Sequence, residues 1–286
     1  MEYPLLDTLT RSLSLLEAVV LGIVQGLTEF LPISSSAHQR IVATFFGWED
    51  PGAAFTAVTQ LGTEAAVLIF FRHELWAIAT KWLQSLRDPT LRSHPDAKMG
   101  WYIIVATIPI GILGLAFEQQ IENGARDLYL IGTVLIVFAL VLWYADERGT
   151  HARELHQIST RDGVLIGLAQ SLALIPGVSR SGATMSAGLL LGLERPAAAR
   201  FAFLLAVPAV VASGLFELVG ILSGEEGGDE PFGYLVIATV ISFVVGYAAI
   251  AWLLRYLAHH SVKLFVIYRV LLGSLVLILV ATGAIS

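Results

Sequence analysis

The chain has 286 residues, of which 56% are hydrophobic and only 14% are charged, with a mean hydropathy of +0.75. Soluble domains carry about a quarter charged residues, so the composition predicts an integral membrane protein whose charges lie in loops, and the net charge of −6 carries little information. The chain has no basic patch with interleaved aromatics, so we expect no nucleic-acid partner. The absence of cysteine excludes disulfides and thiol chemistry.

Six apolar runs approach or exceed the roughly 20 residues that a membrane-crossing helix needs. They are residues 53–71, 101–117, 129–144, 199–222, 232–254 and 264–285. Two further apolar regions, residues 13–46 and 163–193, are interrupted by short polar stretches, which predicts two re-entrant helical hairpins. Irregular backbone at that depth is tolerable only where it is buried in protein or lines a wet cavity. The expected fold is therefore an all-α polytopic membrane protein with a single domain over residues 1–286.

The two polar stretches resemble each other across half of the chain. LTEFLPISSSAH occupies residues 27–38 and LIPGVSRSG occupies residues 174–182. Pairs of like residues lie 145 positions apart, namely Gln25 with Gln170, Ser34 with Ser179 and Ser36 with Ser181. This register predicts an internal repeat, with one copy over about 13–145 and the other over about 162–286. Broken segments at matching positions indicate a binding site at the repeat interface.

The distribution of lysine and arginine predicts the orientation of the chain. Basic residues gather in the segments after the first, third and fifth apolar runs and before the fourth, which we expect to be loops on the cytoplasmic side. The opposite loops, residues 118–127 and 224–230, are nearly free of basic residues. The repeats are then inverted, so the hairpins enter from opposite faces and their tips meet near the middle of the membrane.

Glu29 lies in an apolar stretch, three residues before Pro32. A carboxylate at membrane depth is costly and by default indicates function, although a capping role or an ion pair with Arg180 is the simpler explanation. Gln25 lies one helical turn earlier and shares the face of Glu29. On its own, Gln25 is typical of helix-packing hydrogen bonds.

Ser34, Ser35 and Ser36 follow Pro32 directly. Consecutive non-helical residues expose amides that bind anions, and the hydroxyls add donors and a candidate nucleophile, although serine is also common in simple turns. His38 closes the stretch. A lone histidine is usually structural, but one near Ser35 and a carboxylate is a candidate base or nucleophile.

Arg180 is flanked by Ser179 and Ser181 and lies between two glycines. Arginine suits bidentate contact with phosphate, and glycines let backbone approach a ligand closely. The alternative is a structural partner for Glu29. We favour a phosphate cradle, with Gln25 and three further residues as surrounding groups: Gln60, Glu64 and Thr184.

Together these residues supply an arginine, a histidine, a carboxylate, several hydroxyls and exposed amides, a set suited to a phosphate ester or anhydride. Carboxylates hold Mg²⁺ or Ca²⁺ against phosphate oxygens, so Glu29 is the candidate metal ligand. The chain has no GxxxxGK[ST] nucleotide motif. We therefore expect the phosphate to belong to a lipid.

The stretches QGLTEFLPISSSAH (residues 25–38) and IPGVSRSGATMSAG (residues 175–188) resemble the two signature regions of the undecaprenyl-diphosphate phosphatases of the bacitracin-resistance type. The resemblance covers essentially the whole chain. It implies an enzyme of the bacterial cytoplasmic (inner) membrane that removes the terminal phosphate from a C55 polyprenyl diphosphate and so recycles the lipid carrier for peptidoglycan. It also implies a divalent-metal site that faces the periplasm or the exterior.

By motif position, Glu29 matches the second acid of the family's E-x-x-x-E pair, and many members have glutamate where this chain has Gln25. This chain departs from a two-carboxylate metal site at that position. The family's serine and histidine positions fall on Ser34, Ser35 and His38. Its second motif falls on Ser179, Arg180 and Ser181. Ser36 stands where threonine is frequent in the family and keeps a hydroxyl.

The expected mechanism is hydrolysis of the phosphoanhydride, with Arg180, backbone amides and a metal at Glu29 neutralising the diphosphate. Either Ser35 or His38 supplies the nucleophile or activates water. A transporter or flippase of a phosphorylated lipid remains the alternative, because inverted repeats with broken hairpins are a transporter architecture. A phosphatase of the acid-phosphatase-like lipid family is set aside, because its Lys/Arg-Pro motif and paired histidine are missing. Membrane lipids are the expected surroundings, and a homodimer is left open.

Overall fold

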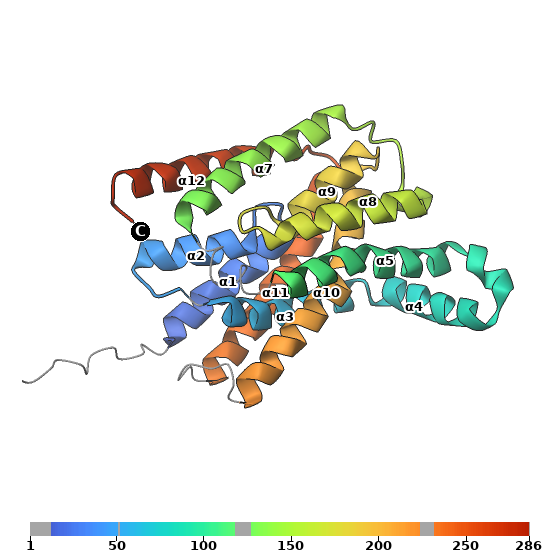
Figure 1. The fold of residues 1–286 in the computed structure, drawn as a ribbon, viewed down its shortest axis with the longest axis horizontal. Coiled ribbons are helices and arrows are strands. Elements are labelled where there is room, and N and C mark those ends of the chain that lie inside the picture. The colour runs from blue at the N-terminus through green and yellow to red at the C-terminus, as the bar shows by residue number, and fades with distance from the viewer. Residues whose placement is uncertain (1–12, 51, 118–126, 224–231, 286) are drawn as a thin grey trace, which may run out of the picture.

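The computed structural model describes residues 13–50, 52–117, 127–223 and 232–285. These residues form an all-α fold, as the apolar runs predict, drawn as a ribbon in Figure 1. In chain order the α-helices are α1 (Leu15–Phe30), α2 (Ser35–Phe46), α3 (Gly52–Phe70), α4 (Arg72–Arg87), α5 (Pro95–Ala116), α7 (Leu128–Arg148), α8 (Thr160–Ser171), α9 (Arg180–Leu190), α10 (Arg195–Ser223), α11 (Phe232–Leu257) and α12 (Lys263–Ala281). Short 3-10 helices cover Pro89–Ser93, Leu155–Gln157 and Leu172–Leu174.

The six predicted apolar runs all correspond to helices. Five helices, α5, α7, α10, α11 and α12, are long and apolar enough to cross a membrane, and α3 contains a shorter apolar segment over Phe55–Phe70. The chain is therefore a multi-pass membrane protein. The number of crossings, the two re-entrant hairpins and their sidedness stay predictions, because the spans are identified by length and composition alone. The segments that we predicted to be the non-cytoplasmic loops, residues 118–127 and 224–230, lie almost entirely outside the described residues.

The segment after the first apolar run is not the loop that we predicted. Most of it is the amphipathic helix α4, which packs along α5. Its buried Ile78 faces the bundle, whereas Trp76, Leu83 and Leu86 are exposed among basic residues. A helix with apolar and basic residues of this kind suits the membrane interface. The apolar residues of α4 recur at helical spacing, which is typical of an amphipathic helix. The many charged residues between them led us to predict a loop instead.

Helices in the two halves of the chain pack in corresponding pairs. Helix α1 packs on α11, and α8 packs on α5; α3 packs on α11, and α10 packs on α5. Figure 1 shows α7 and α12 side by side along one edge of the bundle, and their contacts agree. This pairing is the one that a duplicated chain would make, while the boundaries of the two repeats stay a prediction.

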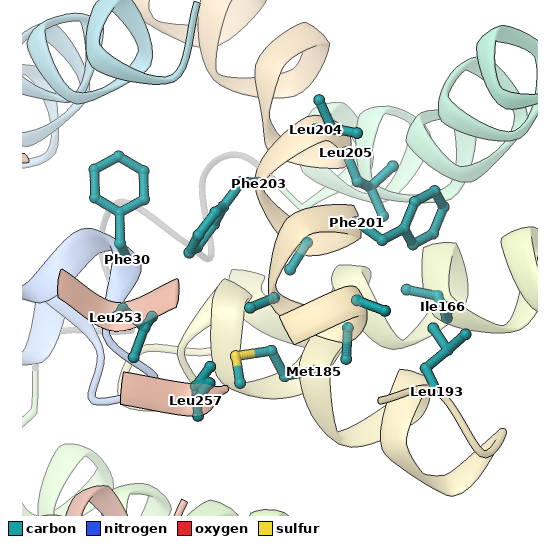
Figure 2. Packing of buried hydrophobic residues seen from close by; sticks show 14 of the residues in the cluster. Phe30, Ile166, Met185, Leu193, Phe201, Phe203, Leu204, Leu205, Leu253 and Leu257 are labelled. Atoms are coloured by element: carbon teal, nitrogen blue, oxygen red, sulfur yellow. The ribbon is translucent and has the colours of Figure 1, made fainter. Parts of the chain in front are cut away.

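The hydrophobic core holds together the helices that carry the polar stretches. Figure 2 shows Phe30 of α1 facing Phe203 of α10, and their rings meet edge to face with centroids 5.2 Å apart. Met185 of α9 and Leu253 of α11 belong to the same cluster. Because lipid is as apolar as these side chains, close packing rather than removal from water stabilises such contacts. The core thus fixes the ends of α1 and α9 at which the candidate site residues lie.

Candidate active site

The first polar stretch is a turn that the sequence forces between α1 and α2. Leu31 precedes Pro32 and is extended, with φ −64° and ψ 140°, because the proline ring disfavours helical backbone in the residue before it. Ser34 then caps α2 with φ at 75°, and its hydroxyl accepts a 3.5 Å hydrogen bond from the Ala37 amide. The chain therefore reverses at Pro32 to Ser34 and starts a new helix at Ser35.

The second polar stretch makes a turn of the same kind between α8 and α9. Ser179 caps α9 with φ at 73°, and its hydroxyl accepts a 3.1 Å hydrogen bond from the Gly182 amide. A residue other than glycine in this region costs about 1–3 kcal/mol and persists where the surroundings hold it, often at functional sites. Ser34 and Ser179 lie at equivalent positions of the two stretches, so both turns carry the same strain.

The two turns contact each other, although they lie about half a chain apart. Ser181 donates a 3.1 Å hydrogen bond to the Leu31 carbonyl. Arg269 of α12 lies between the turns with its side chain fully buried. Its guanidinium donates to Pro32 O of the first turn at 3.0 Å and to Gly177 O of the second at 2.7 Å. One side chain thus joins both turns, and it brings their polar groups to one place.

Glu29 is the centre of the resulting cluster. Its Oε2 accepts hydrogen bonds from Ser35 Oγ at 2.6 Å, from Gln25 Nε2 at 2.8 Å and from Gln60 Nε2 at 3.4 Å. Its Oε1 forms an ion pair with Arg180 Nη2. The carboxylate therefore contacts a hydroxyl on one side and a guanidinium on the other. Such an arrangement suits a base that takes the hydroxyl proton.

Glu64 of α3 is a second carboxylate in this cluster. Its Oε1 lies 3.5 Å from the same Nη2 atom of Arg180 that contacts Glu29. Its Oε2 is buried and has no hydrogen-bond partner among the described residues. Charges buried at membrane depth are normally paired and mark functional sites, so Glu64 belongs with the candidate site residues rather than with the structural ones.

His38 lies near the cluster but not on the cavity. Its Nδ1 is 2.7 Å from the Ser34 carbonyl and its Nε2 is 2.7 Å from the Tyr268 hydroxyl, and the two rings stack. Both nitrogens are engaged, and the side chain is buried. In this arrangement His38 holds the backbone of the first turn and has no free nitrogen directed at Ser35.

A cavity of about 600 Å³ opens at the cluster and runs between α5 and α10. The polar residues at its inner end are Glu29, Ser34, Ser35, Ser36, Gln60, Ser179 and Arg180, while Thr107 lies among its apolar residues. The apolar part includes Gly111 and Gly114 and reaches exposed side chains at Leu115 and Phe216. The cavity therefore suits an amphiphile with an anionic head and an apolar tail.

The remaining predicted residues support the cavity without lining it. Thr184 donates to the Arg180 carbonyl at 2.7 Å, and Ser181 binds the first turn. Gln25 is fully buried beneath Glu29, where its Oε1 accepts a 3.3 Å hydrogen bond from Gln39. These residues therefore act on the groups that face the cavity, as surrounding groups do in many sites.

Sequence reasoning missed Arg269 and Tyr268. Arg269 stands inside the apolar run 264–285, which we predicted to be an ordinary membrane helix without candidate residues. A charged residue within a predicted span is a functional hypothesis by default, and that signal identifies Arg269. Tyr268 gave no such signal, because tyrosine is ordinary in a membrane helix.

Comparison with known proteins agrees with the resemblance of the two stretches. A model of the family described as "Bacitracin resistance protein BacA" matches residues 18–275. A protein of Nocardioides sp. named undecaprenyl-diphosphatase is 59% identical over 95% of this chain and 98% of its own length. A protein of Frankia alni named undecaprenyl-diphosphatase 3 is 56% identical over 94% of this chain and 96% of its own length. A protein of Thermobifida fusca named undecaprenyl-diphosphatase is 53% identical over 96% of this chain and 93% of its own length. The chain therefore belongs to the bacitracin resistance protein BacA family.

Proposed function

We propose that this protein hydrolyses undecaprenyl diphosphate to undecaprenyl phosphate and inorganic phosphate. Relatives that share more than half of their residues with it over nearly the full chain are named for this activity. The observation that carries the proposal is the 2.6 Å hydrogen bond from Ser35 to Glu29 at the polar end of an otherwise apolar cavity. It joins a candidate nucleophile to a base where the head group of a lipid diphosphate would lie.

Ser35 is the proposed nucleophile. Its Oγ attacks the terminal phosphorus while Glu29 accepts its proton, and the bond from that phosphorus to the bridging oxygen breaks. Undecaprenyl phosphate leaves with the bridging oxygen, and a phosphorylated Ser35 remains. Glu29 releases that proton to solvent and is again a carboxylate. It then accepts a proton from a water molecule that attacks the phosphorus of phosphorylated Ser35, so that inorganic phosphate leaves and the serine hydroxyl is restored as Oγ regains a proton. Ser35 starts α2, so the partial positive charge of the helix N-terminus also favours the phosphate there.

Arg180 is the proposed partner of the diphosphate oxygens. Its guanidinium is only partly exposed, and it lines the cavity beside Ser179 and Ser36. In phosphoryl transfer the protein contributes mainly positioning and electrostatic stabilisation. Arginine suits this role because its planar fork contacts two oxygens at once.

We also propose that the reaction uses Mg²⁺ or Ca²⁺. Glu29 and Glu64 both contact Arg180, so two carboxyl groups share one guanidinium. An anionic diphosphate would bring further negative charge, which a divalent cation would balance, and the unpartnered oxygen of Glu64 is a suitable ligand. Glu29 and Glu64 would hold the ion, which would neutralise phosphate charge. We expect chelation by EDTA to stop phosphate release and added Mg²⁺ or Ca²⁺ to restore it.

The proposed location is the bacterial cytoplasmic membrane, with the cavity facing the periplasm or cell exterior. The apolar helices support insertion in a membrane. The excess of lysine and arginine in the segments near α4 and α8 supports a cytoplasmic position for those segments.

The decisive experiment measures phosphate release from undecaprenyl diphosphate by the purified protein in detergent. Detergent abolishes sidedness, so a transporter or flippase releases no phosphate, whereas the proposed enzyme turns over. A matched assay with the Ser35→Ala variant tests the nucleophile. A protein that binds the lipid but releases no phosphate would contradict the proposal.

A further inference from the structure

Two carboxylates on different helices meet one guanidinium at the polar end of the cavity, and in the described part of the chain the ion pairs that both of them share run to that single cation. Glu29 of α1 and Glu64 of α3 each place an oxygen against Nη2 of Arg180. The side chain of Glu64 is 1% exposed, and its second oxygen has no partner within the described part of the chain. A buried carboxylate oxygen without a donor is costly. It is therefore expected to have a partner in the working enzyme.

The residue at position 25 cannot supply the second negative charge beside Glu29. Gln25 is neutral, and both ends of its amide are engaged: Nε2 donates to Glu29 at 2.8 Å, and Oε1 accepts from Gln39 at 3.3 Å. The first polar stretch therefore contributes one carboxylate to the site. Among the described residues, the second carboxylate in contact with the same Arg180 atom comes from α3, which packs against α1.

On the basis of the proposed function, we infer that Glu64 is the second carboxylate of a divalent-cation site and takes the role that Gln25 leaves empty. Arg180 Nη2 now lies between the two carboxylates and balances part of their charge. A cation bound there would contact Glu29 and the free oxygen of Glu64. Arg180 would then be released toward the phosphate oxygens in the cavity that it lines. Arginine and cation are thus competitors for one position.

Titration of the purified protein with Mn²⁺ in the absence of lipid, followed by electron paramagnetic resonance, tests this inference without relying on activity. We expect Glu64→Gln to weaken Mn²⁺ binding by at least about tenfold, as loss of a ligand or supporting group does at other metal sites. We expect Arg180→Ala to strengthen binding, because the competing guanidinium is gone. Glu17→Gln removes a buried carboxylate of α1 that accepts from the Ser14 amide outside the cavity, and it should bind Mn²⁺ like the wild type.

Moving the carboxylate from position 64 to position 25 provides a second test of the inference. In the double variant Gln25→Glu with Glu64→Gln, the new carboxylate lies beside Glu29, because residue 25 already contacts that group. We expect Mn²⁺ affinity to return to within a few fold of wild type. Wild-type affinity in Glu64→Gln, or no saturable Mn²⁺ binding by the wild type, would overturn the inference. Loss of phosphate release with Mn²⁺ binding intact in the wild type would instead count against the proposed reaction.

Discussion

Ser35 Oγ donates a 2.6 Å hydrogen bond to Glu29 Oε2 although the two residues belong to different helices. The turn at Pro32 folds α2 back beside the end of α1 and so creates this contact. Arg180 reaches the other oxygen of the same carboxylate from the second half of the chain. The positions of the proposed nucleophile, the proposed base and the Arg180 guanidinium therefore depend on two turns that are held together.

The first prediction concerns the two neighbouring serines. Both line the cavity, but only Ser35 contacts Glu29; Ser36 lies 3.4 Å from Ser34 Oγ. We expect Ser35→Ala to lower kcat by about 10³-fold or more, as loss of a nucleophile does elsewhere. Ser36→Ala is the matched control and should lower it less than about tenfold. Equal losses in both variants would show that the hydroxyls only bind phosphate.

The second prediction concerns the geometry of Arg180. Arg180→Ala should abolish measurable phosphate release. Arg180→Lys keeps the charge but loses the planar fork, so we expect kcat/KM to stay about 10²-fold or more below wild type. Phosphate release from the C55 diphosphate in detergent gives the rates. Turnover by the lysine variant close to that of the wild type would exclude a bidentate contact.

The helices and the two polar stretches were accessible from the sequence because each leaves a local signal. Apolar runs at membrane length identify α3, α5, α7, α10, α11 and α12, and the proline and serine residues identify the turns. The contact between the turns followed only from the internal register. Side-chain partners could not be predicted, because they depend on packing between distant helices.

His38 and Glu64 illustrate that limit. From the sequence, His38 looked like a candidate base because it follows Ser35 closely, but α2 turns its ring toward Tyr268 of α12. Glu64 looked like a surrounding group, yet α3 brings it against Arg180. Neither side-chain orientation can be predicted from the neighbouring residues in the sequence, because both depend on which helices pack together.

The third prediction concerns Arg269, which joins both turns. Its guanidinium donates to carbonyls of Leu135, Pro32, Gly177 and Val178. Arg269→Ala leaves several buried carbonyls without a donor, each costing about 1–3 kcal/mol. We expect the free energy of unfolding in detergent to fall by about 3 kcal/mol or more, with kcat falling in parallel. Tyr268→Phe removes one neighbouring hydroxyl and should cost only about 1 kcal/mol.

Wild-type stability and activity in the Arg269→Ala variant would contradict this prediction. If Arg269→Ala unfolds at the wild-type temperature and keeps wild-type kcat, the turns are held by other contacts, such as the Ser181 bond to Leu31. Scanning calorimetry and the phosphate assay on the same preparations distinguish the two cases.

The fourth prediction concerns the apolar part of the cavity. Gly111 of α5 lines it, and a Cβ added there would meet nothing within 4 Å. Gly111→Leu should therefore fold normally but fill space needed by the prenyl chain. We expect kcat/KM to fall about tenfold or more for the C55 diphosphate, with little change for a C15 diphosphate whose tail is shorter. Gly233→Leu, on α11 away from the cavity and equally open, is the control and should affect neither substrate.

The last prediction concerns topology, on which the inverted repeat depends. Glu49 follows the first predicted hairpin and Glu194 follows the second, 145 positions apart, and both are exposed. The chain has no native cysteine, so single-cysteine variants at these positions are labelled without background. Because basic residues favour the cytoplasmic side, Glu49→Cys should react with an impermeant reagent added to intact cells. Glu194→Cys, which neighbours Arg195 and Arg200, should react only after the membrane is opened. Reaction of both from the same side would mean that one hairpin crosses the membrane completely, and the two turns would then have to meet by a different path.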